Sequence, residues 1–595
     1  MALKNRLLIV PIMPIATRAL RFSLCFLSPF VFANEPFQSH PEPRVQDSLR
    51  RQEDRARDLN QALAPLAATL KPADLPQIST ALPIEQPCFA LNKINVLAPS
   101  TQAALPSWLL QSLNQQVFTH YLGQCAGVRG LSHIAAAADA ELLRLGLATS
   151  RVVVPPQNMG SGELNLQLHL GRVAGVRMQD GGKDDLRWGT WANAFPSWPV
   201  MSAGDVLNVH DLEQGVEQMN RLPSQHVVTR LEPGTEPDTS VVFIDRQSGD
   251  LLQRLRGGIT LDNSGSPSLG RTQLSSYLAF DNALGLNDIL NLSFNTNAEN
   301  PDSDHQSQSV SASYSIPWGN HTFSSTYSSS KFAQWVAGTT ARFLSSGESE
   351  SADLRWQYQL LRSSSARFSV STALSSRRSN SYLDDVELLV QRRRTTQQEF
   401  GINYRQLVGS ASFDLGLNYK SGRAWYDAED DYPAEMDNGL TLRPSITTLD
   451  FGVAAPFQIG PQAVQYNFNL HGQSTPNTTL SNEQIAIGGR SNVRGFDGDT
   501  VLMAENGYYL RNELSTSLPM PEGLGLQAYW GLDYGRVWGP SDAMLIGHKL
   551  AGTALGLRGQ WKKAQFDLSA ASPLHQPEGM NADPYIWYGS VTLSF

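Results

Sequence analysis

Charged side chains are scarce in this sequence: they make up 17% of its 595 residues, and the formal net charge is −9. A negative charge balance argues against nucleic-acid binding, because a phosphate backbone attracts basic surfaces. Long apolar runs are also missing, since no stretch of 18 apolar residues follows residue 33. The sequence therefore predicts no α-helical membrane span. That test does not detect a membrane β-barrel, whose strands alternate apolar and polar residues.

Cysteine occurs at only three positions, Cys25, Cys88 and Cys125. Residues 1–33 have the pattern of a secretory signal peptide, with a basic first part, a short apolar segment and a small-residue cleavage site ending at Ala33. Cleavage removes Cys25, so Cys88 and Cys125 are the remaining pair in an exported chain, where an oxidising compartment permits a disulfide. Two buried free thiols are the alternative, and two isolated cysteines do not favour a metal site.

Sequence motifs of catalysis are absent as well. There is no Walker-type phosphate loop, no His-Glu-x-x-His and no Gly-x-Ser-x-Gly, and the 11 histidines do not cluster at metal-ligand spacing. Scattered Ser, Asp and His side chains can meet in space, but no pattern in the sequence indicates an enzyme, a cofactor or a metal site.

Residues 34–87 combine a polar helix with a proline-rich linker. The helix is predicted from Arg44 to Ala64, and its thin apolar stripe includes Leu49, Leu59 and Leu63 among Arg, Asp, Glu and Gln. So polar a helix does not enter a dry core. It is either a solvated helix or a plug in a water-filled barrel lumen, and the prolines that follow predict an extended linker.

Two small α/β modules are predicted next, over residues 88–171 and 172–247. In the first module, strands and amphipathic helices follow the order β-α-α-β-β. Ser132 is the expected N-cap of the second helix, which continues to Leu145. The second module repeats much of that order. Exposed edge strands of such modules can pair with an extended peptide by β-augmentation.

The remaining residues, 248–595, have the pattern of a membrane β-barrel. Helical periodicity disappears, and segments of about ten residues with alternating hydrophobicity are separated by turn residues. About 345 residues at roughly 21 per strand and connection predict about 16 antiparallel strands. The last strand is the clearest, because its apolar and polar residues alternate up to Phe595. A soluble β-sandwich is the alternative, but it does not explain so long a run of similar strands.

The stretch at about 481–506 is predicted to be a long loop between two barrel strands. It contains the tetrapeptide Val493-Arg494-Gly495-Phe496, which resembles the VRGF/Y signature of barrel proteins that carry polypeptide-transport-associated (POTRA) domains. In that superfamily the loop folds back into the barrel lumen. The resemblance also favours a plug for the helix at 44–64, and a terminal phenylalanine like Phe595 is typical of bacterial outer-membrane barrels.

Both α/β modules resemble POTRA domains of two-partner secretion transporters. Pro156-Gln157 and Gly162-Glu163-Leu164, together with the two cysteines, resemble the first POTRA domain of that family; Leu212–Gly215 and Asn220–Pro223 resemble the second. The resemblance implies an outer-membrane protein whose periplasmic modules recognise an unfolded exoprotein and whose barrel secretes it without ATP. The family's exoproteins are large and β-helical: adhesins, haemolysins and contact-dependent inhibition toxins. Outer-membrane lipid and, during biogenesis, the barrel-assembly machinery are the further implied partners.

Arg494 is predicted to pair with Asp533 on the barrel wall. Residues 527–535 alternate as a strand, so Asp533 faces inward, and Gly531 and Gly535 leave space beside it. A lone carboxylate that simply faces water is the alternative. The glycine gap and the resemblance to the superfamily's contact between an arginine loop and an aspartate strand favour the pair.

Two other functions are compatible with this pattern: a barrel-assembly factor of the same superfamily and a passive porin-like channel. Two POTRA modules with an N-terminal helix disfavour the first, because the essential bacterial assembly factor carries five. POTRA modules have no evident purpose in the second. The sequence does not identify the exoprotein.

Overall fold

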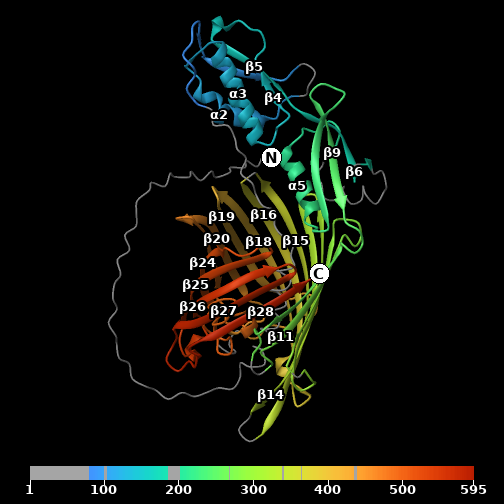
Figure 1. The fold of residues 1–595 in the computed structure, drawn as a ribbon, viewed down its shortest axis with the longest axis vertical. Helices are drawn as coiled ribbons and strands as arrows, with labels where there is room; N and C mark the ends of the chain where they lie inside the picture. The colour runs from blue at the N-terminus through green and yellow to red at the C-terminus, as the bar shows by residue number, and fades with distance from the viewer. Residues whose placement is uncertain are drawn as a thin grey trace, which may run out of the picture. The chain divides into compact units, whose positions relative to one another are not determined.

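The computed structural model (Figure 1) describes residues 79–99, 104–181, 183–184, 202–266, 269–299, 301–337, 341–363, 365–433 and 439–595. The predicted signal peptide (1–33) and the predicted plug helix with Arg44, Leu49, Leu59 and Leu63 lie outside this part of the chain. Among the described residues, no helix is both long enough and apolar enough to cross a membrane.

The first module is a small sheet covered by two helices. Its elements are β1 (Phe89–Ala90), β2 (Lys93–Leu97), α2 (Ser107–Gln116), β3 (Cys125–Ala126), α3 (Val128–Arg144), β4 (Arg151–Val153) and β5 (Glu163–His169). The sheet order is β2-β5-β4, with β2 parallel and β4 antiparallel to β5. Alternation along β5 places Leu164, Leu166 and Leu168 in the core, where none of the three has exposed surface.

Helix α3 begins four residues before the predicted cap at Ser132, and a distant residue caps it. The carboxylate of Glu85 accepts hydrogen bonds from the N–H groups of Gly127, Arg129 and Gly130 at 2.8, 3.0 and 2.6 Å. Ser132 Oγ donates instead to the Val128 carbonyl inside the helix. Burial opposes ionisation of Glu85, but the three N–H donors outweigh it and lower the pKa of Glu85.

Residues 79–87 pack on the first module, although their prolines predicted a linker. The hydroxyl of Tyr121 donates to the Ser79 carbonyl at 3.0 Å, and the N–H of Leu82 donates to the side chain of Gln124 at 3.1 Å. Leu82 also packs against the apolar core of the module. The folded part of the chain therefore begins before Cys88, because this segment completes both the core and the start of α3.

The second module has a four-stranded sheet in the order β7-β6-β9-β8. Its elements are β6 (Arg172–Asp180), β7 (Lys183–Asp184), α5 (Val209–Asn220), β8 (Gln225–Pro233) and β9 (Thr239–Ser248). Leu212 and Met219 of α5 are buried with Val173, Val242 and Ile244 of the sheet. The module therefore has its own hydrophobic core.

The third part is a closed antiparallel barrel of sixteen strands within the described residues, as the sequence predicted (Figure 1). The strands are β10 (Leu255–Asp262), β11 (Gln273–Asp281), β12 (Ile289–Asn297), β13 (Gln306–Trp318), β14 (His321–Ala337), β15 (Arg342–Arg362), β16 (Ala366–Leu383), β18 (Arg393–Val408), β19 (Ala411–Arg423), β20 (Ser445–Ile459), β21 (Gln462–Ser474), β24 (Asn506–Leu518), β25 (Leu524–Trp538), β26 (Lys549–Trp561), β27 (Ala564–His575) and β28 (Ile586–Ser594). The two-residue β17 (Val386–Glu387) adds to β16. Pairing of β10 with β28 closes the barrel and leaves no open edge.

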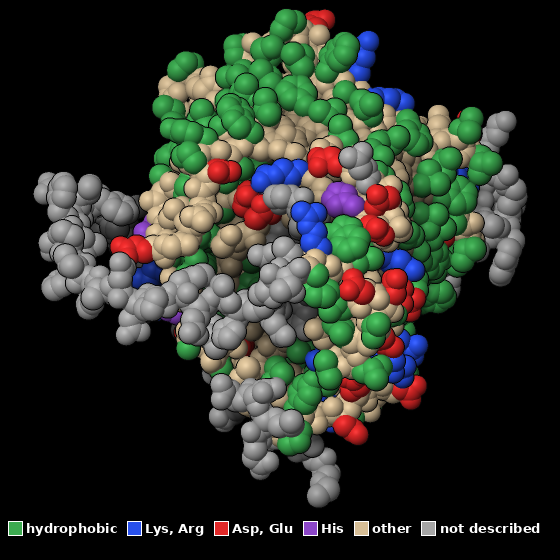
Figure 2. Space-filling model, turned by 90° about the horizontal axis from the view of Figure 1, so that it is seen from below, with side chains coloured by type: hydrophobic (Ala, Val, Ile, Leu, Met, Phe, Trp, Pro, Cys, Tyr) green, Lys and Arg blue, Asp and Glu red, His purple; other side chains and the backbone are tan. Residues whose placement is uncertain are grey.

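Alternation along the barrel strands separates an apolar outer face from a polar inner face. In β28 and the adjoining terminus, Trp587, Leu593 and Phe595 are exposed while Tyr588 is buried. The backbone of Phe595 bonds Gly257 of the β10 strand in both directions, at 2.9 and 3.3 Å, so the last residue belongs to the closure. In Figure 2, hydrophobic side chains cover the flanks of the face shown, and charged side chains gather nearer its middle.

Candidate functional site

The chain between β21 and β24 enters the barrel and forms a hairpin there. Its strands are β22 (Ile485–Ile487) and β23 (Leu502–Ala504), which pair antiparallel. Residues 482–486 of this inward loop line a cavity of about 1360 Å³, together with polar side chains of the barrel strands. The loop therefore occupies part of the barrel lumen.

A small hydrophobic cluster holds the loop against the wall. Ile487, Val493 and Phe496 of the loop are buried together with Val537 of β25 and Leu550 of β26. Burial of these side chains stabilises the folded loop because their apolar surface is removed from water. The two apolar residues of the signature, Val493 and Phe496, therefore contribute to packing.

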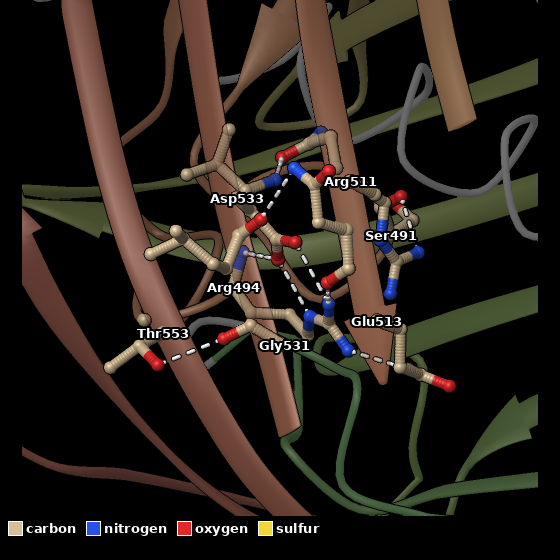
Figure 3. A network of polar contacts seen from close by, with 12 residues as sticks. Ser491, Arg494, Arg511, Glu513, Gly531, Asp533 and Thr553 are labelled. Carbon is tan, nitrogen blue, oxygen red and sulfur yellow. Dashed lines mark hydrogen bonds and ion pairs between the residues drawn. The ribbon is translucent and has the colours of Figure 1, made fainter. Parts of the chain in front are cut away.

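Arg494 lies against the barrel wall and contacts Asp533 of β25 (Figure 3). Its Nε donates to Asp533 Oδ2 at 2.6 Å and its Nη2 donates to Oδ1 at 2.8 Å. The backbone N–H of Arg494 donates to the same carboxylate at 3.1 Å. Both side chains are buried, at 4% and 0% exposure. This fork is the bidentate geometry that gives a charge-assisted contact a defined direction.

A second carboxylate, which the sequence reasoning missed, also contacts Arg494. Nη1 of Arg494 donates to Glu513 Oε2 at 2.9 Å, and Arg558 donates to the other oxygen of Glu513 at 2.6 Å. Glu513 lies on β24 directly opposite Gly531 of β25. The available signal was an inward-facing carboxylate on the strand before Asp533, but it identifies no partner until the strand register is known.

Glycine provides the space in which Arg494 lies. A Cβ on Gly531 would lie 2.1 Å from Nη2 of Arg494, and a Cβ on Gly552 would lie 1.6 Å from the Arg494 carbonyl oxygen. Gly531 was singled out in the sequence, whereas Gly552 of β26 was not. These two positions allow the loop backbone to approach the wall closely enough for the bidentate contact.

Tyr588 of β28 fixes the other side of the signature. Its hydroxyl donates to the Phe496 carbonyl at 2.6 Å and accepts from the Gly495 N–H at 3.2 Å. Both backbone groups are buried, and a buried polar group without a partner is costly. Polar side chains of three strands, β24, β25 and β28, thus form hydrogen bonds with the signature.

The cysteine pair belongs to the first module. Cys88 and Cys125 form a disulfide that closes a loop with a sequence separation of 37 residues. It lies beside the short pair of strands in which Phe89 is opposite Ala126. The disulfide therefore fixes the start of the module next to the start of α3.

A closed sixteen-stranded barrel that follows two small α/β modules and contains an inward arginine loop defines an outer-membrane barrel protein of the POTRA-containing class. Residues 238–559 match the family described as haemolysin secretion/activation protein ShlB/FhaC/HecB. Residues 89–171 match a ShlB-type POTRA domain, and residues 172–233 match a POTRA domain. The chain belongs to this family of two-partner secretion transporters.

Relatives and solved structures agree over nearly the whole length. The chain is similar to the outer membrane transporter CdiB-2 of Burkholderia pseudomallei, with 35% identity over 94% of this chain and 97% of that protein. It is 26% identical to the hemolysin transporter protein ShlB of Serratia marcescens, over 88% of this chain and 90% of ShlB. The structure of CdiB from Escherichia coli matches with a TM-score of 0.79 and 27% identity, covering 94% of this chain and 100% of that one.

These matches place the barrel in the outer membrane and the POTRA modules in the periplasm. The protein is a transporter that secretes a partner exoprotein, and it belongs to a family of transporters, not of enzymes. Secretion of an exoprotein is therefore the function of this chain, and not barrel assembly or passive diffusion through a porin-like channel.

Proposed function

We propose that the first POTRA module receives the unfolded exoprotein at the free edge of β2. Within the described residues, β2 pairs only with β5, so its other edge has backbone groups available for an extended peptide. On the β4 edge of the same sheet, the N–H of Val152 already has a partner, because it donates to Asp139 of α3 at 2.7 Å. This difference between the two edges is the observation that carries the proposal.

In the second module, a side chain likewise covers part of one edge strand, β8, which makes that edge less accessible than β2. On β8, the N–H of Val227 donates to the side chain of Asn220 at 2.7 Å, and the amide of Asn220 donates back to the Val227 carbonyl at 2.8 Å. The last residue of α5 thus covers the beginning of that edge. An extended segment that adds to β2 needs no such contact to be broken.

A photocrosslinking amino acid tests this edge in the full-length transporter. It replaces Leu97 at the end of β2 in one variant and Val153 at the end of β4 in a matched control; their side chains are 51% and 38% exposed. The secretion domain of the partner, presented unfolded, is expected to crosslink at position 97 and not at 153. Crosslinking at 153 alone, or only within the barrel, would contradict the proposal.

We further propose, from the sequence identities to two relatives, that the exoprotein is of the contact-dependent inhibition class. The CdiB-2 relative shares 35% identity with this chain, whereas the ShlB haemolysin transporter shares 26%. Co-expression with a contact-dependent inhibition exoprotein and, separately, with a haemolysin-type exoprotein tests this assignment. The first exoprotein is expected in the culture medium only when this transporter is present.

The transport energy is expected to come from folding of the exoprotein outside the cell. The sequence contains no Walker-type loop for a nucleotide. An unfolded chain that folds into a β-helix after it leaves the lumen cannot readily return, so folding gives the movement its direction. A partner whose β-helix is destabilised should therefore be secreted more slowly.

A further inference from the structure

The inward loop contacts a second sector of the barrel wall through Glu483. This residue ends the short 3-10 helix Ser481–Glu483, which precedes β22. Gln397 of β18 donates to Glu483 Oε1 at 2.8 Å. Two cations flank the carboxylate: Arg377 of β16 lies 3.8 Å from it, and Lys420 of β19 lies 3.6 Å from it. Strands β20 and β21 separate this sector from the strands that hold Arg494.

The two attachments differ in burial and in hydrogen bonding. At Arg494 the ion pair is closed by two short hydrogen bonds, and its members are 4% and 0% exposed. At Glu483 the carboxylate is 10% exposed, its cations are 21% and 32% exposed, and both ion pairs are longer than a hydrogen bond. Water and ions screen partly exposed pairs more than buried ones, so these two ion pairs are weaker than the buried pair of Arg494 and Asp533.

We propose that Glu483 is a positioning residue of the transporter and the releasable attachment of the inward loop. Arg494 stays bound to β25 during transport, while the Glu483 end leaves β16, β18 and β19. Glu483 itself lines the cavity, as do its neighbours Asn482 and Gln484. Movement of this end therefore widens the lumen for the substrate without breaking the buried Arg494 contact. This inference rests on the secretion function and not on the edge of the POTRA module.

Glu483→Gln removes the charge, keeps the side-chain size and retains an oxygen that accepts from Gln397. Hydrogen exchange of the full-length protein, followed by mass spectrometry, reports on the two attachments separately. Exchange over residues 480–487 is expected to rise by roughly fivefold, as for the loss of a partly exposed ion pair. Exchange over 493–497 is expected to stay at the wild-type value. The matched control is Glu348→Gln, which breaks an exposed pair with Lys331 between β14 and β15.

A charge reversal separates this role from a loss of folding. Glu483→Lys places a cation beside Arg377 and Lys420, and exchange over 480–487 is expected to rise further. Adding Lys420→Glu restores an opposite charge and is expected to restore protection of that segment. Unchanged exchange in Glu483→Gln, a joint rise over 480–487 and 493–497, or no restoration in the double variant would each overturn the proposal.

Discussion

Arg494 and Asp533 are 39 residues apart in sequence and meet inside the barrel through three hydrogen bonds, two from the guanidinium and one from the backbone N–H. Because the aspartate is on a barrel strand and the arginine is in the loop, the contact sets the position of the loop relative to the wall. Its expected role is to keep the pore in a transport-competent state.

Arg494→Ala and Asp533→Ala should each abolish or severely reduce secretion while the barrel still assembles. Removing one member leaves a buried charge without its partner, which destabilises the folded site by roughly 3–5 kcal/mol at most. Arg494→Lys should also be impaired, because an ammonium cannot form the two-pronged contact. Secretion is measured at equal barrel abundance, and wild-type secretion from either alanine variant would show that the loop is not held in this way.

Gly531→Ala should reduce secretion without preventing insertion of the barrel. Its new methyl group would meet the Arg494 guanidinium at 2.1 Å, so the arginine must leave its site. Gly525→Ala on the same strand is the matched control, since the nearest atom there is 3.9 Å away. Equal secretion by the two variants would mean that the space beside Asp533 is not needed.

The disulfide should make a measurable contribution to stability of the first POTRA module. A closed loop of this length stabilises the folded state by roughly 3–4 kcal/mol on the chain-entropy model. Denatured, unreduced mature protein is expected to show no reactive thiol, and Cys88→Ser with Cys125→Ser should lower the free energy of unfolding. Two labelled thiols in the wild type would contradict the first expectation.

Glu85→Ala should destabilise the first module more than Ser132→Ala, although sequence reasoning selected Ser132 as the cap. The folded-state pKa of Glu85 lies below its ordinary value of 4.5. Its stabilisation is therefore present above about pH 4.5 and is lost as the pH falls through the lower folded-state pKa. Urea unfolding of a fragment that contains both POTRA modules measures the difference between variant and wild type at neutral and acid pH. This difference should shrink in acid; a constant difference would point to packing instead.

Deletion of residues 44–64 should raise the ion conductance of the inserted barrel in planar bilayers. The prediction depends on a polar helix followed by a long proline-rich linker, which gives it the reach to enter the lumen. Secretion is expected to continue, because a plug must leave the lumen before a substrate passes. A deletion variant with unchanged conductance would remove the plug interpretation.

Local pattern was sufficient for the fold class and for the direction in which side chains point. Alternation with a period of two places Asp533 on the inner face whichever strands are its neighbours, and the same alternation separates Trp587 from Tyr588. The pairing of Cys88 with Cys125 could be predicted from an oxidising compartment and from the removal of Cys25 with the signal peptide. These conclusions follow from the alternation of side chains within one strand, or from the number of cysteines in the exported chain.

The contacts that join distant segments were decided only by the tertiary structure. Glu85 caps α3 from 42 residues before Gly127, while the nearby Ser132, a good cap by residue type, bonds inside the helix. Glu513 reaches Arg494 because closure of the barrel fixes the register of β24 against β25. Glu483 meets Arg377 and Lys420 only because the loop bends into the lumen. The sequence supplies these charges, but their pairing depends on strand register and loop path, which are set by packing over the whole barrel.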